Sequence, residues 1–154
     1  MLDLLFPRHA DNDYRGHPIA LWVFVPITVI TLVRSLIHVF ALDGGAQSIA
    51  TIPLDTMTQG GAQGVVTMFA LWGLSQLLLG FVYVTVLWRY RSLLPLMYLL
   101  LLVEYAGRLA IGAMKPIAVL ETPPGATMNP IAIVLALVML FLATREGRPA
   151  PAPA

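Results

Sequence analysis

Four runs of mostly apolar residues fill most of this 154-residue chain, and they constrain its fold more than any other feature. They cover residues 19–42, 65–88, 93–114 and 128–144. A helix needs roughly 20 apolar residues to cross the hydrocarbon core of a bilayer, at about 1.5 Å per residue. A helix also satisfies its own backbone hydrogen bonds in lipid. We therefore predict an all-α integral membrane protein, an antiparallel four-helix transmembrane bundle.

The composition supports the membrane class and excludes several others. Hydrophobic residues make up 58% of the chain and charged residues 11%, whereas soluble domains carry roughly 25% charged residues. A chain this short cannot hide that much apolar surface in a soluble core. The net charge of +1 provides no basic surface for nucleic acid. The lack of cysteine excludes disulfides, thiolate metal sites and thiol catalysis.

The segments outside the spans are short. The first run, 19–42, is longer than the apolar region of about 7–15 residues in a signal peptide, so we expect it to be a retained span. Residues 1–18 are predicted to be a cytoplasmic N-terminal segment, with a short interfacial anchor at residues 1–6. Residues 145–154 alternate proline and alanine near their end and are predicted to form a loose, extended tail.

Basic residues concentrate on one side of the predicted spans. Lys115 is the single basic residue in the two loops of the opposite side. The positive-inside rule then places both termini in the cytoplasm, which agrees with an even number of spans. Eight arginines against one lysine, with frequent alanine and proline, fit a GC-rich bacterial genome, so we expect the bacterial inner membrane. The basic residues of the predicted inner side are Arg8, Arg15, Arg89, Arg91, Arg145 and Arg148.

The predicted outer side carries one long loop, residues 43–64. It is rich in glycine and repeats the tetrapeptide Gly-Gly-Ala-Gln at 44–47 and 60–63. A loop of this length is unusual in a helical bundle. Its central residues are partly apolar, so we expect it to lie on the outer membrane surface or to cap the bundle.

Aromatic residues lie near the predicted membrane boundaries. Trp22 and Trp88 fall at the inner boundary, whereas Phe40, Phe69 and Trp72 fall toward the outer one. Tryptophan and other amphipathic aromatic side chains are enriched at both interfaces of membrane proteins. We therefore interpret these five residues as an aromatic belt.

Several polar residues lie inside the predicted spans. Glu104 is near the bilayer midplane, and Arg108 follows it by four positions, so both share one helix face with the acid first. A charge at that depth costs on the order of 2.5–3.5 kcal/mol, so these side chains should face protein. Because the spans alternate in direction, polar residues of three spans fall at compatible depths. We predict a buried polar cluster of Arg34, His38, Gln76, Glu104 and Arg108.

Small residues accompany this cluster. Gly73 and Gly80 lie on the same face of the second span as Gln76, and Ala106 and Ala110 are four positions apart in the third span. Small residues allow membrane helices to approach each other closely. The sequence does not separate a face that packs within the chain from one that packs against another chain.

Two interpretations of the polar cluster follow from its composition. In the first, which we favour, the cluster is structural: each polar contact between membrane helices contributes only about 0.6 kcal/mol but fixes which helix faces meet. In the second, two guanidinium groups near one carboxylate bind an anionic or carbonyl-bearing ligand. A lipid head group, a quinone or a small organic acid has that chemistry.

The sequence predicts no metal and no cofactor. His38 lies near the predicted outer side, whereas His9 and His17 lie on the inner side, so two axial haem ligands are not available at one depth. One Glu and one His within the spans are too few for a metal site. Ser35 and Ser75 lack a neighbouring base, so no nucleophilic catalysis is predicted.

We therefore expect a small, non-enzymatic integral membrane protein that acts by association, as a homo-oligomer or as an accessory subunit of a membrane complex. In this reading the polar cluster specifies helix packing. The alternative is a binding or transport protein for a small anionic, lipid-like or quinone-like ligand at Arg34, Glu104 and Arg108. A third reading is a membrane enzyme with Glu104 or His38 as its acid–base group.

Overall fold

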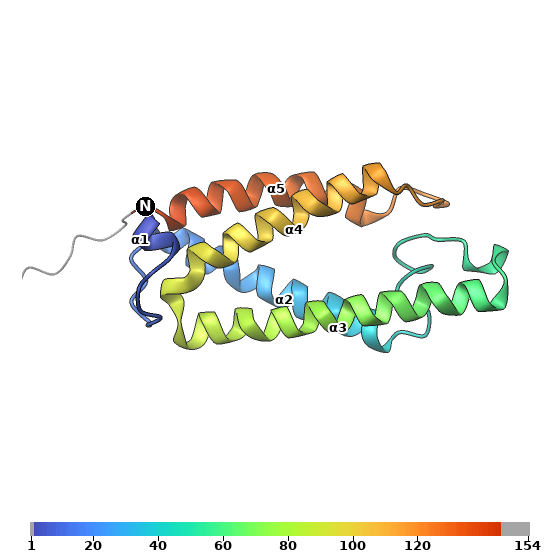
Figure 1. Cartoon of the computed structure of the whole chain (residues 1–154), viewed down its shortest axis with the longest axis horizontal. Coiled ribbons are helices and arrows are strands. Elements are labelled where there is room, and N and C mark those ends of the chain that lie inside the picture. The colour runs from blue at the N-terminus through green and yellow to red at the C-terminus, as the bar shows by residue number, and fades with distance from the viewer. Residues whose placement is uncertain (1, 146–154) are drawn as a thin grey trace, which may run out of the picture.

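The computed structural model describes residues 2–145, which form helices joined by turns and loops, with no strand among them. Four of the helices are long and apolar enough to cross a membrane, as the sequence predicts. They are α2 (Pro18–Phe40), α3 (Gln59–Arg89), α4 (Leu94–Met114) and α5 (Pro124–Ala143) (Figure 1). The shorter elements are α1 (Leu2–Leu5) and the 3-10 turns η1 (Leu54–Thr56) and η2 (Arg91–Leu93). The predicted Pro/Ala tail, 145–154, lies outside the described residues except for Arg145.

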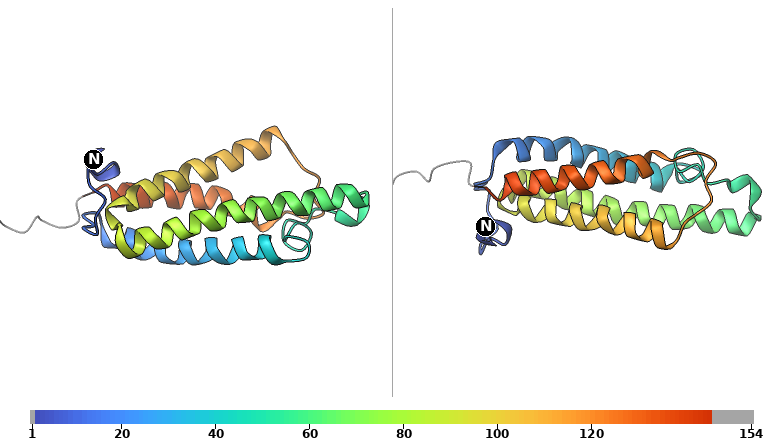
Figure 2. Two further views of the ribbon diagram at one scale, coloured as in Figure 1. Left: turned by 60° about the horizontal axis from the view of Figure 1, so that its bottom comes forward. Right: turned by 90° about the horizontal axis from the view of Figure 1, so that it is seen from above.

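The four long helices are arranged as two pairs. α2 lies along α3, and α4 lies along α5, while α2 also contacts α5 and so joins the pairs (Figures 1 and 2). At one end, the backbone N–H of His17 donates to the carbonyl of Leu142 at 3.1 Å, so the start of α2 meets the end of α5. We call this the proximal end, which also carries η2. The distal end carries Phe40, Gln59, Met114 and Pro124.

Local capping sets the helix boundaries. α2 begins at Pro18, whose fixed φ suits the first helical position, and His17 Nδ1 accepts from the N–H of Ile19 at 3.3 Å. α3 begins at Gln59 rather than at position 65, because Thr58 Oγ1 accepts from the N–H of Gly61 at 3.2 Å. The glycines at the start of α3 have low hydropathy, so the apolar run in the sequence begins later than the helix itself.

The other boundaries also differ by a few residues from the apolar runs. α5 begins at Pro124 rather than at position 128, again with proline in its first turn. α2 ends at Phe40 rather than at position 42, because Ala41 is extended, with a ψ of 144°. Gly44 and Gly45 then turn the chain with φ values of 60° and 75°. Glycine adopts positive φ without steric cost.

An apolar core fills the proximal half of the bundle. Phe24 is at its centre, with ring centroids 5.0 Å from Tyr83 and 5.2 Å from Tyr98, both at edge-to-face angles. Tyr98 Oη donates to the carbonyl of Ala20 at 2.6 Å, so the buried hydroxyl is satisfied. All four long helices contribute to this core: Ala20, Phe24, Tyr83, Val86, Leu94, Met97, Tyr98, Leu101, Ala136, Met139 and Ala143.

The N-terminal segment packs against the proximal end. Ser92 Oγ donates to the carbonyl of Asp11 at 2.9 Å and accepts from the N–H of Asp11 at 3.0 Å. The N–H of Ser92 donates to the same carbonyl at 3.2 Å. Leu4 of α1 is buried. The segment is thus fixed to the turn between α3 and α4, and its role as an interfacial anchor stays a prediction.

The loop of residues 41–58 is organised around one carboxylate. Asp43 accepts hydrogen bonds from the backbone N–H groups of Gly45, Gln47 and Ser48 at 2.9, 3.1 and 2.7 Å. Burial of Asp43 raises the pKa of its carboxyl group. The hydrogen bonds from the backbone lower this pKa by more, so that it falls to about 2. The ionised carboxylate therefore holds the glycine-rich turn in one conformation.

The two distal loops are joined at Thr51. Its carbonyl accepts from the N–H of Leu120 at 2.9 Å, and its hydroxyl donates to the carbonyl of Glu121 at 2.7 Å. Thr51 has a φ of 56°, a left-handed conformation that is strained for a β-branched residue. The loop after α2 is thereby bonded to the loop before α5, and each loop belongs to a different helix pair.

Candidate functional site

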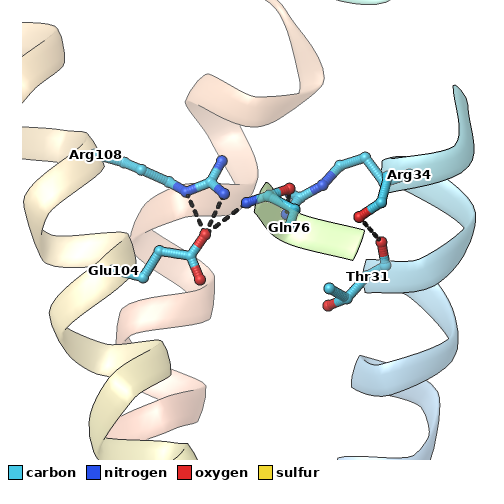
Figure 3. A network of polar contacts seen from close by, with 6 residues as sticks. Thr31, Arg34, Gln76, Glu104 and Arg108 are labelled. Carbon is cyan, nitrogen blue, oxygen red and sulfur yellow. Dashed lines mark hydrogen bonds and ion pairs between the residues drawn. The ribbon is translucent and has the colours of Figure 1, made fainter. Parts of the chain in front are cut away.

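A chain of polar contacts crosses the bundle between three helices (Figure 3). Arg34 Nη2 of α2 donates to Gln76 Oε1 of α3 at 2.8 Å, and Gln76 Nε2 donates to Glu104 Oε1 of α4 at 2.7 Å. Glu104 Oε1 also accepts from Arg108 Nε at 3.1 Å and pairs with Arg108 Nη2. We call these four residues the polar network, and they are four of the five predicted cluster members.

Close packing of α2 on α3 places Gln76 in the interior. A Cβ at Gly73 would lie 2.5 Å from the Cβ of His38, and a Cβ at Gly80 would lie 2.7 Å from Leu32 Cδ2. These two glycines flank Gln76 on one face of α3, so the helices approach most closely where the amide reaches between them. Gln76 is 5% exposed, and both ends of its amide are hydrogen-bonded. Such a satisfied polar group can be buried at little cost.

The charges of the network do not cancel. The side chains of Arg108 and Glu104 are 18% and 26% exposed and form an i,i+4 pair. Arg34 donates to the neutral amide of Gln76 and has no carboxylate partner within residues 2–145. The network therefore carries a formal charge of +1.

Trp72 completes the site, and the sequence analysis did not assign it there. The Arg108 Cζ lies 4.7 Å from the centroid of the Trp72 ring, and the Arg34 Cζ lies 6.0 Å from it. Arg108 also lies 5.2 Å from the ring of Tyr105. A guanidinium over an aromatic face at these distances is attracted by the ring. Trp72 precedes Gln76 by four positions, so helical spacing was the signal that places it on the same face.

The fifth predicted member, His38, lies beside the polar network without bonding to it. His38 Nδ1 is 2.7 Å from the carbonyl oxygen of Gly44, and because a carbonyl only accepts, Nδ1 donates. The ring stacks against Trp72 with centroids 4.8 Å apart and is 4% exposed. His38 therefore fastens the distal loop to α2. Phe69, also assigned to the outer belt, contacts the same ring at 5.6 Å.

The serine hydroxyls of the long helices bond within their own helices. Ser35 Oγ and Ser75 Oγ donate to the carbonyls of Thr31 and Leu71, one turn earlier in their own helices. In the part of the chain that the structure describes, no three acidic or histidine side chains converge as metal ligands. Arg34 Nε and Tyr83 Oη are the buried side-chain atoms of residues 2–145 that lack a hydrogen-bond partner. Each atom can donate a hydrogen bond to an acceptor oxygen.

Comparisons with protein-family models, curated proteins and solved structures find no match for this chain. Its function is therefore inferred from the polar network and from the helices that carry it.

Proposed function

We propose that this chain is a small, non-enzymatic integral membrane protein that acts by association, as a homo-oligomer or as an accessory subunit of a membrane complex. In this proposal the four helices form an antiparallel transmembrane bundle, with the proximal end and both termini in the cytoplasm. The concentration of arginine at the proximal end supports this orientation. We place the protein in a bacterial inner membrane.

The observation that carries the proposal is the exposure of the distal halves of α4 and α5. No residue from 102 to 135, all of which the structure describes, is buried within the chain. The proximal halves of the same helices contribute Leu94, Met97 and Met139 to the apolar core. The proximal half of each helix thus packs into the core, and the distal half leaves side chains open to lipid or to another helix.

The distal half of α4 has the composition of a helix–helix contact. A Cβ added to Gly107 or Gly112 would meet no atom within 4 Å. Ala106 and Ala110 are exposed on the same half-helix. Glycine weakens a helix relative to alanine by roughly 1 kcal/mol, and in membranes small residues are enriched where another backbone approaches. We name Ala106, Gly107 and Ala110 the small-residue surface of α4.

The polar network supports this role by fixing the position of α4. α3 and α4 are joined by η2 at the proximal end but contact each other at few places elsewhere. The hydrogen bond from Gln76 to Glu104 links the two helices further along their length. The network therefore holds the small-residue surface of α4 in a defined orientation.

Cysteine cross-linking tests the proposal, because the native chain contains no cysteine. Gly107→Cys is compared in membranes under mild oxidation with Val82→Cys, a change at an exposed residue of α3. A homo-oligomer should give a covalent dimer with Gly107→Cys and much less with Val82→Cys. Native mass spectrometry of the unsubstituted protein then reports its copies or a stoichiometric second subunit. Equal cross-linking at both positions, with a monomeric mass, would refute association.

A further inference from the structure

We propose that Arg34, Arg108 and Trp72 form a binding site for a phosphate oxyanion, either the phosphate of an anionic lipid head group or free phosphate. The inference is independent of the association proposed above, because a monomer and an oligomer can both carry the site. It follows from the charge, the donor atoms and the depth of these residues.

The charge of the site calls for an anion. Within the described spans, Glu104 neutralises Arg108, while Arg34 has only the amide of Gln76 as a partner. A guanidinium stays protonated in proteins, so its charge cannot be removed by loss of a proton. One bound monoanion neutralises the network. The same excess charge disfavours a cationic ligand.

Both guanidinium groups keep donor hydrogens that no acceptor in the described part of the chain uses. Arg34 uses Nη2 for Gln76 and leaves Nε buried without a partner among residues 2–145. Arg108 uses Nε and Nη2 for Glu104, so its Nη1 is left without a hydrogen-bond partner in that same range. Figure 3 shows the two side chains extending toward Gln76 from α2 and α4. Planar guanidinium groups bind phosphate oxygens with two parallel hydrogen bonds.

The depth of the site places it within reach of lipid head groups. Arg34 precedes the distal end of α2, Phe40, by six residues, and Arg108 precedes the distal end of α4, Met114, by six residues. Each guanidinium-bearing residue is thus about 9 Å along its helix from the distal end. Trp72 is 37% exposed, so the site borders the surface of the bundle. Long arginine side chains and tryptophan rings commonly meet the head-group region.

Trp72 provides the reporter for the test. The chain has three tryptophans, and Trp22 and Trp88 are exposed near the proximal end, so a Trp22→Phe/Trp88→Phe protein keeps Trp72 alone. We would titrate this protein in detergent with short-chain phosphatidylglycerol, with short-chain phosphatidylcholine and with inorganic phosphate, and follow its fluorescence. A saturable response to phosphatidylglycerol, with none to phosphatidylcholine, is expected.

Substitutions assign the response to Arg34. Arg34→Gln keeps an amide for Gln76 but removes the unpaired charge, and the affinity should fall at least about tenfold. Arg34→Lys keeps the charge without the planar donors and should give an intermediate affinity. Arg89→Gln, a change at an exposed arginine of the proximal end, is the matched control and should leave the affinity unchanged.

The outcomes separate the two sources of the anion. A response to phosphatidylglycerol alone identifies a lipid head group, whereas a response to inorganic phosphate as well identifies the phosphate group itself. Equal responses to both lipids, no saturable response, or full affinity in a folded Arg34→Gln protein would overturn the proposal. If circular dichroism shows that Arg34→Gln loses its helices, the lipid preference of the parent protein decides. The mass of the assembly is measured separately, so failure of one proposal leaves the other intact.

Discussion

The two ends of the bundle are held together by different kinds of contact. At the proximal end, aromatic and aliphatic side chains from all four helices interlock around Phe24. In the distal half, α4 diverges from α3, as Figure 1 and the left view of Figure 2 show, and the two helix pairs are connected there by hydrogen bonds of the polar network and of Thr51. One end depends on shape, and the other depends on a few directional bonds.

The difference follows from lipid as a solvent. Apolar surface gains no hydrophobic free energy when one membrane helix packs on another, because lipid tails are equally apolar. Dispersion forces must then come from tight interlocking, which large rings at the proximal end provide. Where helices diverge, dispersion contributes less, and each polar bond determines which faces meet. Substitutions where helices pack tightly should therefore change stability, and substitutions in the polar network should mainly change the position of α4.

The largest effect is expected from Phe24→Ala at the proximal end. The change removes a fully buried ring and two edge-to-face contacts, and it should lower the free energy of unfolding in mixed micelles by about 3 kcal/mol. Phe40→Ala is the matched control, because Phe40 lies in the same helix and is 75% exposed. Equal losses at both positions would remove the distinction between the two ends.

A smaller effect is expected where α2 meets α3. Gly73→Ala puts a methyl group 2.5 Å from His38 Cβ and 3.1 Å from the carbonyl oxygen of Ser35, so the helices must separate locally. The cost should be about 2 kcal/mol in the same unfolding assay. Gly107→Ala meets no atom within 4 Å and should leave the stability of the isolated chain unchanged or slightly higher. A tolerated Gly73→Ala would show that the close approach is not required.

The next effect concerns geometry in the distal half. Glu104→Leu removes the partner of Arg108 and of Gln76, and because Glu104 is 26% exposed the loss should be only about 1 kcal/mol. The distance between spin labels at the exposed residues Met68 and Ile111 should nevertheless become more broadly distributed, as measured by double electron–electron resonance. Labels at Val82 and Leu100, nearer the proximal end, should keep their distance distribution. An unchanged distal distribution would mean that the network does not position α4.

The smallest effect concerns acid and the loop of residues 41–58. The pKa of Asp43 is lowered to about 2 from its usual 3.8, so the ionised form is favoured by folding. Its contribution to stability is complete above about pH 4 and is lost as the pH falls to about 2. The melting temperature of the parent protein should fall across this window more than that of Asp43→Asn. Asp3→Asn, at an exposed residue of α1, should reproduce the parent profile.

Much of this fold could be predicted from sequence because lipid imposes one simple requirement. Apolar runs of sufficient length mark spans, and four residues of the polar network were found because charges and amides inside such runs must face protein. The helical spacing of Glu104 and Arg108 also implied their pairing, which the structure shows.

Other features could not be predicted because they depend on how segments meet. From the sequence, Trp72 is expected at the membrane interface. Its contact with Arg108 depends on how α4 packs beside α3, which the sequence does not show. His38 is predicted to belong to the polar cluster because it lies at a similar depth along its span. Its hydrogen-bond partner is instead the carbonyl of Gly44, in the turn after α2. The start of α3 depends on the cap at Thr58 and not on apolar content. No sequence pattern around Thr51 indicates that it bonds to the loop before α5, which is distant in sequence.

The left-handed backbone of Thr51 has a consequence for how readily the molecule opens. Its three hydrogen bonds to Leu120 and Glu121 contribute roughly 1 kcal/mol each, while a strained backbone of this kind stores about 1–3 kcal/mol. Parting the two helix pairs there breaks the bonds but also relaxes the strain, so the terms nearly offset each other. The contact between the two distal loops at Thr51 is thus nearly balanced in free energy, so these loops can separate at little cost while the Gln76–Glu104 hydrogen bond still joins α3 to α4.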